Sequence, residues 1–118
     1  MRKTAEKTDF YSDFQFPEWG KWPDPKGMVK YLHENGLKCI LWQIPIIKYI
    51  NSLHHIQKDR DEGYALEHGY CAKKKDGTPY RMPEGWFTDS LLMDYTSSEA
   101  ASWWMDKRKY LVDEVQID

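Results

Sequence analysis

A run of apolar residues directly after a helix-like pattern constrains the fold of this chain more than any other feature. Residues 37–44 read Leu-Lys-Cys-Ile-Leu-Trp-Gln-Ile and are almost continuously apolar after the single lysine. Such a run is typical of a strand buried on both faces, and strands of that kind belong to parallel sheets. Pro45 cannot donate a ladder hydrogen bond, so we expect the strand to finish at about 42–44 and a loop to follow.

The segment before this run carries the start and stop signals of a helix. Asp24 can cap a helix, and Pro25 stands at the first helical position, where its missing N–H costs nothing. Apolar residues recur at helical spacing from Met28 to Leu32, and Asn35-Gly36 supplies a left-handed stop. The pattern predicts a helix that ends near Asn35.

Residues 46–90 form a long excursion, and long insertions in compact domains are usually functional. We expect a possible helical turn at 46–55 and a solvated surface at the charged run 58–62. Asp76-Gly77 signals a hairpin turn that the lysines of 73–75 flank, and residues 83–86 signal a second turn.

The last part of the chain predicts a short extended segment at 91–95 that delivers Asp94 to a turn. Thr96 and Glu99 have capping-box spacing, so a helix should run from about Ser98 to Glu114. Residues 115–118 have the pattern of a strand that is just beginning.

The order is therefore helix, buried strand, excursion, helix and incipient strand, which is the rhythm of an α/β fold with a parallel sheet. A complete (β/α)8 barrel needs about 250 residues, and this chain has 118. We expect an incomplete piece of such an architecture, whose unpaired sheet edges make the isolated chain marginally stable or prone to aggregate.

Charge and hydropathy exclude several classes of partner. The 17 basic and 19 acidic residues leave a net charge of −2, which sets up no field for nucleic acid or anionic lipid. No apolar run reaches the roughly 20 residues of a membrane span, and the N-terminal segment lacks the apolar stretch of a signal peptide. We expect no nucleic-acid or membrane partner and a cytoplasmic location.

The cysteines and histidines predict no metal or cofactor. Cys39 lies in the apolar run, where a cysteine is usually a small buried hydrophobe, and Cys71 with His68 makes an incomplete ligand set. His54 and His55 are adjacent, point in different directions on a helix, and read as part of a solvated loop. The chain also has no glycine-rich phosphate loop and no serine elbow.

Trp42 and Ile44 are the first candidates for ligand contact. Ligands of parallel α/β sheets bind beyond the C-terminal ends of the strands, and an indole there offers a flat apolar surface to a sugar ring. The alternative is that Trp42 packs a helix against the sheet.

The carboxylates define no catalytic pair, because nothing in their spacing brings two of them together. Asp24 is better explained as a helix cap and Asp94 as a turn residue before a helix. The acidic residues that lie near aromatic ones are Asp13, Glu18, Asp24, Asp89 and Asp94.

Several ordered blocks of residues resemble glycoside hydrolase family 31, the family of α-glucosidases and α-xylosidases. The blocks are the segments 22–29, 32–38 and 41–45, then Gly69-Tyr70, Asp76-Gly77, Trp86 and 94–100 with Trp103-Trp104. The resemblance covers about residues 9–118, where Ser97-Ser98 replaces the usual Asn-Pro, and leaves residues 1–8 as a non-matching extension.

The resemblance implies a segment of a (β/α)8 barrel from the helix after the second strand to the beginning of the fourth, with 46–90 as a long loop beside the active site. Trp42 then matches a tryptophan that lines the −1 sugar subsite, with Ile44 and Trp86 as further substrate-binding candidates, and Asp13-Phe14 matches a pair at the rim. The family retains configuration by means of two aspartates. Both lie downstream of Asp118 in the resemblance, so no catalytic residue is assigned, and the isolated chain should be inactive.

Three hypotheses stand side by side. The first is a piece of a retaining α-glycosidase for α-glucosides or α-xylosides, with the remainder of the barrel as its partner and no cofactor. The second is a stand-alone carbohydrate-binding or protein-interaction module that uses the aromatic surface. The third is a truncated gene product without function.

Overall fold

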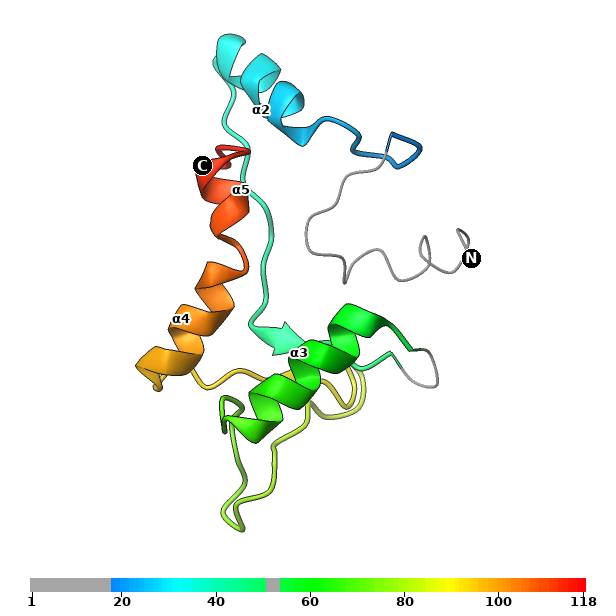
Figure 1. Ribbon diagram of the computed structural model, residues 1–118, viewed down its shortest axis with the longest axis vertical. Coiled ribbons are helices and arrows are strands. Elements are labelled where there is room, and N and C mark those ends of the chain that lie inside the picture. The colour runs from blue at the N-terminus through cyan, green and yellow to red at the C-terminus, as the bar shows by residue number, and fades with distance from the viewer. Residues whose placement is uncertain (1–17, 51–53) are drawn as a thin grey trace. The chain divides into compact units, whose positions relative to one another are not determined.

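The structure is a computed structural model that describes residues 18–50 and 54–118, with its helices and strands labelled in Figure 1. The described residues divide into two compact units. Unit 1 contains the described residues up to Gln43 together with Met105–Asp118, and unit 2 contains Ile44–Trp104. Among the described residues no helix is long and apolar enough to cross a membrane.

The predicted first helix is confirmed as α2, Pro25–Glu34, in unit 1. The carboxylate of Asp24 accepts a hydrogen bond from the backbone N–H of Gly27 at 3.0 Å. A Cβ at position 27 would stand 2.2 Å from Asp24 Oδ2, so a larger residue there would make the Asp24 carboxylate shift. The helix ends at Asn35, and Gly36 follows with φ +75°, the left-handed stop that the sequence indicates.

The predicted buried strand at 37–44 is wrong for this chain. The segment is extended but forms no strand, and Leu37, Ile40 and Leu41 are 56%, 80% and 46% exposed. A strand buried on both faces needs neighbours on both edges. Among the described residues no strand pairs with this segment, and Asp118 donates its N–H to the carbonyl of Cys39 at 2.9 Å.

The two strands that do form lie in unit 2, and the first of them begins just beyond Pro45. The described sheet consists of β1, Ile46–Ile47, and β2, Leu91–Leu92, paired antiparallel with Ile46 opposite Leu92. Pro45 precedes β1 and joins the ladder only through its carbonyl, which accepts a hydrogen bond from Met93 N at 2.9 Å. The missing N–H of Pro45 therefore leaves the ladder intact. The helical turn expected at 46–55 is wrong where the structure describes that segment.

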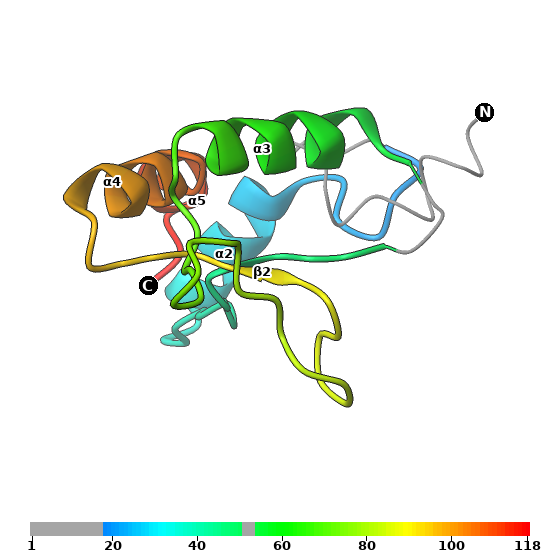
Figure 2. The same cartoon turned by 90° about the horizontal axis from the view of Figure 1, so that it is seen from below.

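The charged run that reads as solvated surface lies inside a helix, α3, Ile56–Glu67. His55 caps α3 by accepting from Gln57 N at 3.2 Å through Nδ1. Lys58 is only 7% exposed, which the alternation of charges does not predict. Ala65 of α3 is buried in the same core as Ile47 of β1 and Leu91 of β2, and Figure 2 labels α3 and β2.

Both predicted turns of the excursion are confirmed. Gly77, with φ +87°, donates to the carbonyl of Lys74 at 3.0 Å, and Lys73 bridges Pro79 across the hairpin. In the second turn Gly85 has φ +113° and donates to the hydroxyl of Thr88 at 3.1 Å.

The last helix begins at Ser98 as predicted but with a different cap and a break. Ser97, not Thr96, accepts from Ala100 N at 3.2 Å, because Thr96 donates its hydroxyl to Asp94. The helix divides into α4, Ser98–Asp106, and α5, Lys109–Asp113. Bonds of the i to i+3 type flank the break at Arg108, and the chain ends without the strand expected at 115–118.

Each unit has its own core. Unit 2 packs the ladder, α3 and α4 around residues that are at most 6% exposed: Ile47, Ala65, Cys71, Leu91, Met93, Ala100 and Trp104. Outside this core Tyr64 stacks between His68 and Trp103, with ring centroids 3.8 and 5.5 Å away, and so joins α3 to α4. Unit 1 packs Val29, Leu111 and Val115.

Candidate functional site

The structure places the three candidate substrate-binding residues on different kinds of surface. Trp42 lies in unit 1 and is 69% exposed, so its indole contributes little to the packing of the described residues. Ile44 is half-buried immediately before Pro45 in unit 2. Trp86 is 58% exposed, also in unit 2.

Trp86 stands in the loop formed by residues 82–90, hereafter the Trp86 loop. Its ring lies edge-on to Phe87 at a centroid distance of 5.0 Å and an interplanar angle of 68°. The Nζ atom of Lys48 lies 6.0 Å from the centroid of the Phe87 ring. Phe87 therefore packs against the edge of the indole from within the loop. More than half of the surface of Trp86 is exposed and accessible to a ligand.

An open depression of about 730 Å³ adjoins this loop within unit 2. Its wall is polar and carries both signs of charge, from Lys74, Arg81, Glu84 and Asp89. Side chains of this kind can donate to and accept from a polyhydroxyl ligand. The depression and the exposed indole thus lie on one loop system that combines hydrogen-bonding groups with an aromatic surface.

The carboxylates with shifted pKa values have structural partners. Hydrogen bonds from the hydroxyl and the backbone N–H of Thr96 lower the pKa of Asp94, which confirms it as a turn residue. Thr78 lowers the pKa of Asp76 in the same way. The backbone N–H of Cys39 and the imidazole of His33 lower the pKa of Asp118. A general acid needs a raised pKa, so these three aspartates do not suit that role.

The other acidic and histidine candidates are distributed rather than gathered. Asp24 is a helix cap, Glu18 is exposed in unit 1, and Asp89 lies on the wall of the depression in unit 2. Asp13 lies outside the described residues. His54 and His55 lie in the loop that precedes α3, as expected, and His54 Nδ1 lies 3.5 Å from Asp59 on that helix.

No group of three metal-ligating side chains converges within residues 18–50 and 54–118. The two described cysteines belong to different units. Cys39 is partly buried in unit 1, whereas Cys71 is buried in the core of unit 2, where burial raises its pKa.

One polar network could not be predicted from the sequence. Glu62 on α3 lies between Lys58 and Arg81, and Arg81 in turn donates to the backbone of the Trp86 loop. The spacing of Lys58 and Glu62 at i and i+4 is a readable signal for their pairing. The contact with Arg81, across a separation of 19 residues, has no signal in the sequence.

Comparison with known proteins identifies relatives of the whole described chain. The family described as glycosyl hydrolases family 31 TIM-barrel domain matches residues 4–118. An isomaltosyltransferase from Sporosarcina globispora is 47% identical over 117 residues, which is 98% of this chain and 11% of that protein.

Two solved structures resemble the fold at substantial sequence identity. A cycloalternan-forming enzyme from Listeria monocytogenes, in complex with a pentasaccharide substrate, matches 84% of this chain and 9% of its own with a TM-score of 0.79 and 44% identity. A cycloalternan-degrading enzyme from Trueperella pyogenes, in complex with a covalent intermediate, matches 88% of this chain and 14% of its own with a TM-score of 0.80 and 36% identity. This chain therefore spans only a small share of each relative.

Proposed function

The chain belongs to glycoside hydrolase family 31 as a segment of its TIM-barrel domain, and we propose that it supplies one wall of the sugar site of a retaining α-glucosyl-processing enzyme. Trp42, Ile44 and Trp86 are the residues proposed to contact the substrate. The exposed indole of Trp42 is the observation that carries this proposal.

Within the barrel, we propose that the segment runs from the helix after the second strand to the beginning of the fourth strand. In this register residues 37–44 are the third barrel strand, and neighbouring strands outside this segment cover them. The high exposure of Ile40 and Leu41 supports this register, because an apolar run of that kind is costly in water.

Trp42 then lies at the carboxyl end of a barrel strand, where ligands of this fold bind. Its indole offers the apolar face of a sugar ring an extended flat surface, and its N–H offers a hydroxyl a donor. Ile44 is half-buried two residues further on and borders the same strand end.

The proposed substrate class is an α-linked glucose oligosaccharide with an isomaltosyl unit. Its support comes from what the relatives are named for, which are isomaltosyl transfer and the formation and degradation of cycloalternan. These names favour α-glucosides over α-xylosides. They also leave two fates for the glycosyl group, transfer to a sugar acceptor and hydrolysis, which share the first chemical step.

No catalytic residue is assigned to this chain. In a retaining glycosidase one carboxylate attacks the anomeric carbon and forms a glycosyl–enzyme ester while a second carboxylic acid protonates the leaving oxygen. The Trueperella relative has been solved in complex with a covalent intermediate. For this chain we propose that both carboxylates are contributed from sequence beyond residue 118, and that its own residues bind and orient the sugar.

An exchange of segments tests the proposal. The matching 117-residue segment of the Sporosarcina isomaltosyltransferase is replaced by this chain, and the resulting graft is assayed for isomaltosyl transfer and hydrolysis. We expect turnover by the graft, and a loss of at least about tenfold in kcat/KM in the Trp42→Ala graft.

The matched control is Trp22→Ala, which removes an indole with 58% exposure from the same unit. It should leave kcat/KM within about twofold, while melting temperatures report whether each graft is folded. The proposal fails if a folded graft is inactive, or if Trp42→Ala and Trp22→Ala have equal effects.

A further inference from the structure

The Trp86 loop is closed at its base by backbone hydrogen bonds. Met82 N donates to Ser90 O at 2.8 Å, and Asp89 N donates to Met82 O at 2.9 Å. Ser90 is completely buried, and its hydroxyl accepts from Tyr49 N at 2.9 Å. These bonds fix the two ends of the loop, so the conformation between them must be held by other contacts.

Two residues of this loop have left-handed backbone conformations that are uncommon outside glycine. Phe87 has φ +51° and Asp89 has φ +63°. For a bulky residue such as phenylalanine this region is a genuine outlier. Conformations of this kind persist only where the surrounding structure enforces them, so a contact that fixes the backbone near Asp89 also governs how Trp86 is presented.

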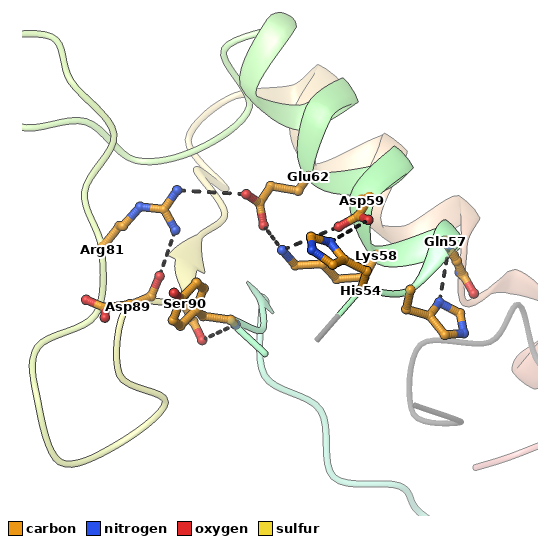
Figure 3. A network of polar contacts seen from close by, with 10 residues as sticks. His54, Gln57, Lys58, Asp59, Glu62, Arg81, Asp89 and Ser90 are labelled. Carbon is orange, nitrogen blue, oxygen red and sulfur yellow. Dashed lines mark hydrogen bonds and ion pairs between the residues drawn. The ribbon is translucent and has the colours of Figure 1, made fainter. Parts of the chain in front are cut away.

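Arg81 makes that contact, as Figure 3 shows. Its Nη1 atom donates to the carbonyl oxygen of Asp89 at 2.8 Å. Arg81 also forms an antiparallel bridge with Leu91, which places it opposite the end of the loop. The guanidinium therefore reaches across the base of the loop and fixes the peptide that follows Asp89.

The other side of the guanidinium is held by α3. Arg81 Nη2 lies 3.9 Å from Glu62 Oε1, and Glu62 Oε2 pairs with Lys58 one helical turn earlier. The side chains of Lys58, Glu62 and Arg81 are 9%, 20% and 38% exposed, so the network leads from the interior to the loop. A buried lysine requires a charged partner, which holds Glu62 in place to receive Arg81.

We propose that Arg81, held by Glu62 and Lys58, is a positioning residue that keeps Trp86 in the orientation in which it contacts carbohydrate. The contact with carbohydrate rests on the proposed function, whereas the ordering of the loop by Arg81 does not need a sugar. Arginine suits this role because one arm of its planar fork donates to a carbonyl while the other pairs electrostatically with a carboxylate in a fixed geometry. Lysine carries the charge without the fork.

The ordering of the loop is tested on the complete 118-residue chain by fluorotryptophan NMR. The Trp86 resonance is assigned by its loss in Trp86→Phe, and the other tryptophans serve as internal references. In Arg81→Gln we expect the Trp86 resonance to shift and broaden while that of Trp22 stays in place. Arg81→Lys should restore the resonance only in part.

The matched control is Arg60→Gln, which removes a guanidinium 3.6 Å from Asp61 on the same helix as Glu62 and should leave the Trp86 resonance unchanged. If Arg81→Gln does not fold, Glu62→Gln is measured in its place. The Trp86 resonance should then shift and broaden in the same direction but to a smaller extent. A Trp86 resonance that is the same in the parent and in the folded Arg81 or Glu62 variant overturns the proposal.

The functional half is tested in the graft with an oligosaccharide substrate. Arg81→Gln should raise KM about tenfold and leave kcat within about twofold, because it misplaces a binding surface and not a reacting group. Suppose that Arg81→Gln moves the Trp86 resonance but does not change KM, and that Trp86→Ala does not change KM either. These results together refute the contact between Trp86 and sugar. That result contradicts the proposed function of Trp86 and leaves the ordering of the loop established.

Discussion

His33 Nε2 lies 2.8 Å from Oδ2 of Asp118, and this contact joins the end of α2 to the residues after α5. The same carboxylate oxygen accepts the backbone N–H of Cys39 at 2.8 Å, across a separation of 79 residues. The segment that follows α2 is thus anchored by the side chain and the backbone of one aspartate far along the chain. These bonds hold the start of residues 37–44 beside the small core of unit 1.

These contacts of Asp118 predict that the stability of unit 1 depends on pH. The Cys39 N–H and His33 lower the pKa of Asp118 in the folded chain. The stabilisation is therefore complete above the ordinary pKa of about 3.9 and is lost as the pH falls through the lower folded pKa. The protection of the Cys39 amide against exchange, measured by NMR relative to the intrinsic rate at each pH, should fall on acidification below about pH 4. The fall should be absent in Asp118→Asn and present in Asp113→Asn; identical profiles in all three chains would contradict it.

The left-handed backbone at Asp89 predicts a stability order for substitutions there. Asp89→Gly should leave the free energy of unfolding unchanged or raise it, because glycine adopts φ +63° without strain. Asp89→Val should lower it by about 1–2 kcal/mol, because a β-branched side chain tolerates the left-handed conformation less well than aspartate, which can hydrogen-bond locally. Denaturant titration of the chain measures both. The same two substitutions at Glu84, which does not have a positive φ, should not show this order.

The proposed register of residues 37–44 predicts that Ile40 matters only in the complete barrel. Ile40 is 80% exposed in this chain, so Ile40→Ala should change the free energy of unfolding of the isolated chain by less than about 0.5 kcal/mol. In the graft the same substitution should cost about 2–4 kcal/mol, as for a buried isoleucine. Equal effects in the two proteins, measured by denaturant unfolding, would exclude burial of this strand in the barrel.

The isolated chain should not turn over α-glucosides. The aspartates with shifted pKa values are engaged in turns and in the His33 contact, and their pKa values are lowered, so none of them suits a general acid. Release of nitrophenol from an aryl α-glucoside should stay at the buffer rate over hours, with the active graft as positive control. Turnover that survives purification and disappears in an Asp94→Asn or Asp118→Asn chain would show that a catalytic carboxylate is present after all.

Local chemistry predicted the elements that depend on neighbours in sequence. The Asp24 cap, the Gly36 stop, the turn at Gly77 and the role of Asp94 are each set by residues a few positions apart, and each is confirmed. The family resemblance was likewise readable from ordered blocks of residues, and the match to residues 4–118 confirms it. The cytoplasmic location and the substrate contacts of Trp42, Ile44 and Trp86 stay predictions.

Features that depend on distant partners could not be predicted. Whether residues 37–44 pair as a strand depends on neighbouring strands, and among the described residues no strand pairs with this segment. The break before α5 coincides with a hydrogen bond from Arg108 Nε to Gln43 Oε1 at 3.0 Å, 65 residues away. Burial of Lys58 depends on how α3 packs on the β1–β2 ladder and on Glu62, which a pattern of alternating charges does not reveal.

The role of Trp42 in a sugar site is open to direct test by a crystal structure of the graft with a bound isomaltosyl oligosaccharide. We expect carbon atoms of a sugar ring within about 4.5 Å of the Trp42 indole, at the carboxyl ends of the barrel strands. A bound oligosaccharide with no ring carbon within that contact distance of the indole would contradict the proposed function.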